Sequence, residues 1–200
     1  MVKEVVALPP SQKHTLVALV EDKPGVLNRV ASLLRRRNFN IESIAVGHSA
    51  QPKLSRMTIV VAGDNAKVEQ ARKQLDKLVE VVKVVDITGY NSVVRELALI
   101  KIKASHVTRS EIIQIVDIFR ANIVDVSADS LIIEVTGDGE KVDSLMELIR
   151  GFGIREIART GIIALTRDGA GPLLVEEGKP SKEPRVTTTS RKATASAPDW

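Results

Sequence analysis

Residues 13–90 alternate between two spacings of apolar residues, the spacing of a buried strand and the spacing of one helical face. The order of this alternation is the feature that most constrains the fold of this chain. Residues 15–20 are apolar at almost every position, as in a buried strand, and the next apolar residues recur at the spacing of one helical face (Val26, Leu27, Val30, Leu33 and Leu34). Later patterns predict strands at residues 41–46, 56–62 and 81–87, with a helix on Val68, Ala71, Leu75 and Leu78. Asp64 is placed to cap that helix. The predicted order is strand, helix, strand, strand, helix, strand.

The same order returns in residues 91–167. Strands are predicted at residues 97–102, 123–126, 131–135 and 154–165, with one helix on Ile112, Ile115, Val116 and Phe119 and another on Val142, Leu145, Met146 and Ile149. Thr108 and Glu111 have the spacing of a capping box. The repeated order predicts an α+β protein made of two ferredoxin-like units in tandem, each with its helices on one face of an antiparallel sheet.

Composition sets the ends of these units and excludes several classes of protein. Residues 168–200 change to Gly, Pro, Ser, Thr, Lys and Glu without periodicity, so we divide the chain into a flexible leader at 1–12, domains at 13–90 and 91–167, and a disordered tail. The chain has no cysteine, which removes disulfides and thiolate chemistry. The net charge of +4 is spread along the chain, unlike the concentrated basic face of a nucleic-acid binder. The leader is too short for a signal-peptide core or membrane span, and we expect a cytoplasmic protein without membrane contact.

The turn at residues 21–27 joins the first predicted strand to the first predicted helix. Pro24 fits the first helical position, so we predict a helix from Pro24 to about residue 37. The backbone N–H groups of Gly25, Val26 and Leu27 are then placed to hold a carboxylate, because Gly25 carries no side chain and a helix start is positive. Asp22 offers a negative charge for an ammonium group. On these residues alone, an ordinary helix-start turn is the preferred interpretation.

Both faces of the first predicted sheet are apolar. The third predicted strand, for example, places Met57, Ile59 and Val61 on one face and Thr58, Val60 and Ala62 on the other. An apolar face without helices predicts a partner, which is the second unit, a second copy of the chain or another protein. We favour a homodimer.

No catalytic or metal site is indicated by the sequence. His14, His48 and His106 lie far apart, and no Ser/His/Asp arrangement or Gly-rich nucleotide loop is present, so we expect no enzyme activity and no metal in this chain alone. An RNA-binding module of the RRM type has the same element order and is the rival interpretation. It requires exposed aromatic residues on the central strands, where this chain has Met57, Ile59 and Val61.

Three stretches then resemble a known family: residues 21–27 (EDKPGVL), 38–43 (NFNIES) and 52–59 (PKLSRMTI). They resemble the ACT domain of the small regulatory subunits of acetolactate (acetohydroxyacid) synthase, and residues 95–102 (RELALIKI) resemble the opening of that family's C-terminal domain. The resemblance implies a noncatalytic subunit in branched-chain amino acid biosynthesis. Such a subunit activates a large catalytic subunit that carries thiamine diphosphate, Mg and FAD, and it confers feedback inhibition by valine. No cofactor is expected on this chain.

The resemblance also implies where the effector binds. ACT domains of this family pair side by side in a homodimer, with Asp22, Gly25, Val26 and Leu27 on one wall of the site and Asn40 and Ile41 of the second copy on the other. Asp22 departs from the family, which commonly has Asn there. A free-standing amino-acid sensor that acts on another partner is the alternative, and co-purification with an acetolactate synthase large subunit distinguishes the two.

Overall fold

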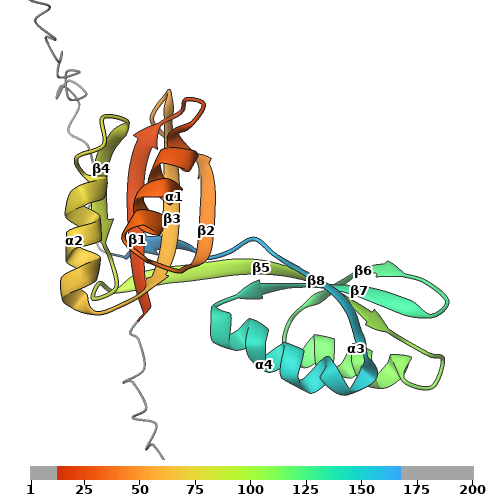
Figure 1. Cartoon of the computed structure of the whole chain (residues 1–200). Coiled ribbons are helices and arrows are strands. Elements are labelled where there is room, and N and C mark those ends of the chain that lie inside the picture. Colours follow the sequence, from red (N-terminus) through yellow and green to blue (C-terminus); the bar gives the residue numbers. More distant parts are fainter. Residues whose placement is uncertain (1–12, 168–200) are drawn as a thin grey trace, which may run out of the picture.

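The computed structural model describes residues 13–167, which form two units joined by one long strand and by a later segment that returns beside it (Figure 1). The predictions of a leader at 1–12 and of a disordered tail from residue 168 fall outside the described residues. The N-terminal unit contains β1 (Lys13–Glu21), α1 (Val26–Arg36), β2 (Ile41–His48), β3 (Leu54–Ala62), α2 (Asn65–Leu75) and β4 (Val81–Asp86). Its antiparallel strands have the order β2-β3-β1-β4, so β1 and β3 are central, as predicted.

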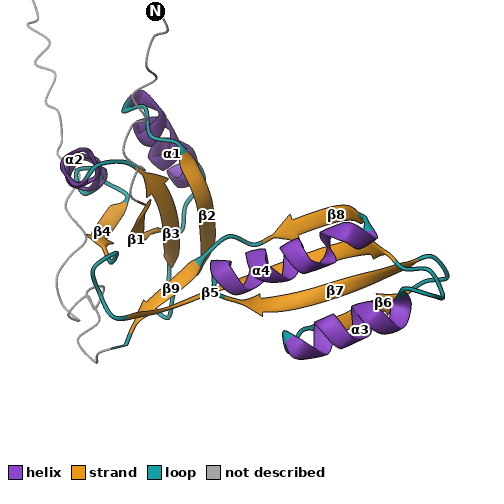
Figure 2. Cartoon of the chain, turned by 90° about the horizontal axis from the view of Figure 1, so that it is seen from below, coloured by secondary structure: helices purple, strands orange, loops and turns teal. Residues whose placement is uncertain are grey.

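The C-terminal unit repeats this arrangement. It contains β5 (Ser92–Lys103), α3 (Arg109–Ile118), β6 (Asn122–Val126), β7 (Ser130–Gly137), α4 (Gly139–Ile149), the short 3-10 helix η1 (Arg150–Phe152) and β8 (Ile154–Arg159), and β9 (Ile163–Thr166) follows. The strand order β6-β7-β5-β8 is the equivalent of that in the first unit. In each unit both helices lie on one face of the sheet (Figure 2), so the predicted tandem of ferredoxin-like units is confirmed. No helix of residues 13–167 has the length and apolar character needed to cross a membrane.

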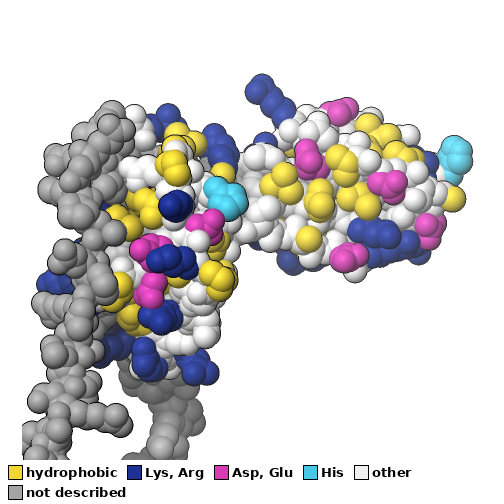
Figure 3. All heavy atoms as spheres, turned by 90° about the horizontal axis from the view of Figure 1, so that it is seen from above, with side chains coloured by type: hydrophobic (Ala, Val, Ile, Leu, Met, Phe, Trp, Pro, Cys, Tyr) yellow, Lys and Arg dark blue, Asp and Glu magenta, His cyan; other side chains and the backbone are white. Residues whose placement is uncertain are grey.

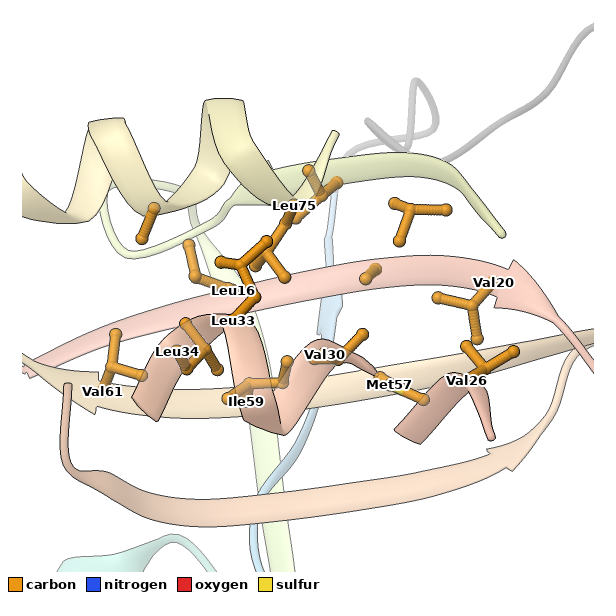
Figure 4. Close-up of a cluster of buried hydrophobic side chains, with 14 of the residues drawn as sticks. Leu16, Val20, Val26, Val30, Leu33, Leu34, Met57, Ile59, Val61 and Leu75 are labelled. Carbon is orange, nitrogen blue, oxygen red and sulfur yellow. The ribbon is translucent and has the colours of Figure 1, made fainter. Parts of the chain in front are cut away.

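The cores lie between the helices and the sheets. In the N-terminal unit, Leu16 and Ile59 from the central strands are fully buried against Val30 and Leu34 of α1 (Figure 4). Aliphatic side chains of this size each stabilise the unit by about 1.5–3 kcal/mol through burial. The helical faces predicted from the spacing are therefore the faces that pack.

Of the two helix caps predicted from the sequence, one is present and the other is not, and a third cap, which was not predicted, is present on α4. The Asp64 carboxylate accepts a hydrogen bond from the Lys67 backbone N–H at 2.8 Å, and Asp138 caps α4 in the same way. Thr108 holds the N-cap position of α3, but its hydroxyl accepts from the Ser105 N–H instead of capping the helix. The predicted capping box is therefore wrong, because the hydroxyl serves the preceding turn.

Two predicted strands of the second unit differ from the structure. The strand predicted at residues 154–165 is interrupted between β8 and β9, where Gly161 has a φ of +81° that strand backbone does not adopt. β5 begins at Ser92, five residues before the predicted start at residue 97, because residues 92–95 pair with β9. We call these paired segments the β5–β9 ribbon.

The β5–β9 ribbon crosses back to the N-terminal unit and packs on the sheet face that lacks helices. Ala164 of β9 and Val94 of β5 contact buried Val17 and Ile87 there. The second unit therefore covers part of the apolar face, which is one of the three partners that the sequence left open. The homodimer stays a prediction, as does the division of the chain at residues 90 and 91.

Candidate functional site: the β1–α1 turn

Gly25 shapes the turn between β1 and α1. Its φ of +87° lies in the left-handed region, and a Cβ built on it would meet nothing within 4 Å. Backbone conformation, not crowding, therefore favours glycine here. Gly25 is the N-cap and α1 begins at Val26, so the predicted helix start at Pro24 is wrong by two residues. Gly25, with its left-handed backbone, ends the turn before the helical dihedral angles begin. Because Gly25 has no side chain, the helix start stays open to a ligand.

The start of α1 is electrostatically unopposed. No side chain caps it, and its first turn contains no acidic residue. The other three α-helices of residues 13–167 each have a capping aspartate or an acidic residue in the first turn, namely Asp64 for α2, Glu111 for α3, and Asp138 with Glu140 for α4. The Val26 N–H makes a long hydrogen bond of 3.5 Å to the Lys23 carbonyl oxygen. The positive potential and the neighbouring N–H donors still make a helix start a favourable position for a carboxylate.

Asp22 is held at the base of this turn by two neighbouring strands. Its Oδ1 accepts a hydrogen bond from the Ser55 hydroxyl at 3.2 Å, and its Oδ2 lies 3.3 Å from Nδ1 of His48. The side chain remains 46% exposed, so its oxygens can still accept from a ligand. Because the carboxylate sits between the hydroxyl and the imidazole, the Ser55 hydroxyl donates to Asp22 and not to His48, which is not the order of contacts in a catalytic triad.

Within one chain, the residues predicted for the first wall of the site lie close together, and the residues predicted for the second wall lie apart from the first wall. Val26 is buried in the core under the turn, and Leu27 beside it is 47% exposed. Asn40 is exposed and Ile41 half-buried at the start of β2, beyond the far end of α1. The eleven residues of α1 place the two ends of the helix about 16 Å apart. One chain therefore presents Asp22, Gly25, Val26 and Leu27 at one end and Asn40 and Ile41 at the other.

A second copy placed beside β2 is the arrangement predicted to make these two walls neighbours, and β2 is an accessible strand for it. β2 is an outer strand of the N-terminal sheet, paired within residues 13–167 with β3 alone. A free strand edge is a ready template for pairing with another chain. The effector interface between two copies nevertheless stays a prediction.

Sequence reasoning missed Ser55 and His48. Ser55 is buried and lies opposite Val20 in the pairing of β1 with β3, and His48 ends β2 directly opposite Ser55. The strand register brings both side chains to Asp22, and no local pattern encodes that register. Ser55 does fall within the residues 52–59 that carried the family resemblance, which was the one available signal.

One face of the molecule carries charges of both signs, unlike a nucleic-acid interface. On the face seen in Figure 3, basic and acidic side chains are interspersed over both units. That face has no continuous positive patch to follow a phosphate backbone.

Two ferredoxin-like units in tandem, the first with an open glycine turn before an uncapped helix, define this chain as a protein of the ACT-domain class. Residues 16–83 match the family described as "AHAS small subunit-like ACT domain", and residues 95–168 match "Small subunit of acetolactate synthase". The chain belongs to the family of acetolactate synthase small subunits.

Individual relatives agree with this assignment. The probable acetolactate synthase small subunit of Archaeoglobus fulgidus is 58% identical over 155 residues, which cover 78% of this chain and 97% of that protein. The acetolactate synthase small subunit of Mycolicibacterium smegmatis is 53% identical over 158 residues, 79% of this chain and 93% of that protein. The crystal structure of the small subunit from Thermotoga maritima is similar with a TM-score of 0.73 at 48% identity, covering 78% of this chain and 98% of that one.

Proposed function

We propose that this chain activates the large catalytic subunit of acetolactate synthase and confers feedback inhibition by valine. The family assignment supports the partner, and the open, unopposed helix start at Gly25 is the observation that carries the effector site. Valine bound there lies between two copies of the chain. The alternative, a sensor for another partner, predicts no co-purification with an acetolactate synthase large subunit and no stimulation of it.

Each part of the amino acid has a counterpart in this site. The N–H groups at the start of α1 receive the carboxylate, and the Asp22 carboxylate, oriented by Ser55 and His48, receives the ammonium. The branched side chain lies against exposed Leu27 and against Ile41 of the second copy. Binding changes the activity of the catalytic partner only where valine has different affinities for two states of the complex.

The decisive experiment replaces Gly25 with aspartate in the reconstituted complex. Aspartate tolerates left-handed backbone better than most residues, and its carboxylate repels that of valine. We expect G25D and N40A to raise the valine concentration for half-inhibition about tenfold or more, with activation intact. G89D is the matched control, because Gly89 also has open surroundings but no positive φ. Unchanged valine inhibition in both G25D and N40A contradicts this site.

Asp22→Asn tests the ammonium contact. Asparagine keeps an oxygen for the Ser55 hydroxyl but removes the negative charge. Hydrogen bonds to charged groups contribute about 1.5–3 kcal/mol and neutral ones about 0.5–1.5 kcal/mol, so valine should bind several-fold more weakly to D22N. Calorimetric titration of the full chain measures this. Equal affinities place the ammonium elsewhere.

A further inference from the structure

A hollow lies on the face of the N-terminal sheet opposite α1. It has a volume of about 350 Å³ and is lined by β2, β3 and the β5–β9 ribbon. Its walls are mostly apolar, with Val46, Val93, Ile163 and Leu165 among them. Three of these residues remain about half exposed (Val46 48%, Ile163 59% and Leu165 62%). The volume is at the lower end of the range for small-molecule sites, so a compact ligand fits it best.

Two arginines give this hollow its charge. Arg56 is half-buried and donates from Nη2 to the carbonyl oxygen of Ala164 at 2.7 Å, and Arg95 donates to the carbonyl oxygen of Val94 at 2.6 Å. Neither guanidinium pairs with a carboxylate in residues 13–167, and no acidic residue lines the hollow. Burial lowers the pKa of Arg56, because its charge has lost solvation and has no opposite charge beside it.

Arg95 is exposed and keeps its solvation, whereas Arg56 is partly withdrawn from water. An anion beside Arg56 would offset part of the solvation that its charge has lost. His48 lines the rim and has Asp22 as its partner, but Asp22 lies outside the hollow. The lining therefore offers positive charge to a ligand and no negative charge.

We propose that this hollow binds a small aliphatic carboxylate that lacks an amino group. Arg56 and Arg95 receive the carboxylate, and the apolar walls receive the hydrocarbon. An α-amino acid is disfavoured because no carboxylate in the lining can pair with its ammonium. The site is distinct from the β1–α1 turn in position and in charge, and it does not depend on the effector proposal.

The test compares three compounds that share one carbon skeleton with the full chain in solution. These are 3-methylbutanoate, valine and 3-methylbutan-1-ol, and binding is followed by amide chemical shifts of Ala45, Gly47 and Ala164. We expect 3-methylbutanoate to shift these amides at concentrations on the order of 10 mM or below. The alcohol and valine should shift them at least about tenfold more weakly.

Three variants separate the charge from the rest of the site. Arg95→Met should weaken 3-methylbutanoate binding about tenfold or more, and so should Arg56→Met, which also loses the hydrogen bond to the ribbon. Arg36→Met, on exposed α1, is the control and should bind normally. Binding should also persist in G25D, which separates this site from the effector site. The proposal is overturned if 3-methylbutanoate does not bind, if the alcohol or valine binds equally well, or if Arg95→Met has no effect.

Discussion

Replacing Gly161 with alanine tests the junction between the two units. Gly161 lies between β8 and β9 against β2, where a Cβ would stand 2.6 Å from Oγ of Ser43 and 3.3 Å from the Ile44 carbonyl oxygen. The Ile162 N–H donates to the Ser43 hydroxyl at 2.9 Å, so Ser43 loses that bond if it moves away. A left-handed alanine costs about 1–2 kcal/mol, and forcing a methyl group into a packed contact costs about 1–3 kcal/mol. We expect G161A to lower the free energy of unfolding by about 2–5 kcal/mol.

The measurement is urea unfolding followed by circular dichroism, with two companion variants. Gly153 has a φ of +95° but its Cβ would meet only Cβ of Lys103 at 3.8 Å, so G153A should show the conformational part alone, about 1–2 kcal/mol. Adding Ser43→Ala to G161A removes the shortest contact and should recover part of the loss. If G161A is no more destabilising than G153A, or if Ser43→Ala recovers nothing, the close approach of β2 and Gly161 is not present.

Three ion pairs give further predictions. Arg159→Met should lower the free energy of unfolding by about 3–5 kcal/mol, because it leaves the Glu96 carboxylate, 3% exposed and held by two guanidinium contacts, buried without a partner. Arg155→Met should lower it by less than about 1 kcal/mol, because its partner Asp129 is 70% exposed. Similar losses for the two variants in urea unfolding would contradict this contrast. The hydrogen bond from Arg72 lowers the pKa of Glu69 to about 2, below its unfolded value of about 4.3. The contribution of the ionised Glu69 side chain to the free energy of unfolding is therefore full above about pH 4.3 and is lost as the pH falls through about 2. A ¹³C NMR titration should show this midpoint, and Arg72→Met should return it toward about 4.3.

The parts of the fold that depend on local spacing were predictable from the sequence. Val142, Leu145 and Ile149 recur at helical spacing and all three are fully buried on α4. The tandem of two units followed from the order of the elements, since few arrangements bury that order. The first residues of β5 were not predictable, because residues 92–95 become a strand only by pairing with β9 about seventy residues later.

The candidate site shows the same division between local and distant information. Asp22 and Gly25 could be named as candidate residues because a strand, a turn and a helix meet within seven residues. The helix start was misplaced because Pro24 favours the first helical position, while the left-handed Gly25 delays the helix to Val26. Ser55 and His48 reach Asp22 only through the register of three strands, which the sequence does not specify residue by residue.

β2 is the one element of residues 13–167 that takes part in the predicted effector site, the junction between β8 and β9, and the hollow beside the ribbon. Ile41 begins it, Ser43 and Ile44 contact the junction between β8 and β9, and Ala45 and Gly47 line the hollow beside the ribbon. An edge strand held on one side can shift more easily than a central one, so a ligand that moves its start also moves Ser43 against Ile162. Such coupling is reciprocal. If valine bound at the start of β2 changes the junction between β8 and β9, then loosening that junction in G161A must change the affinity for valine. G153A must not change it. Equal affinities for valine in the two variants would assign the coupling to another route.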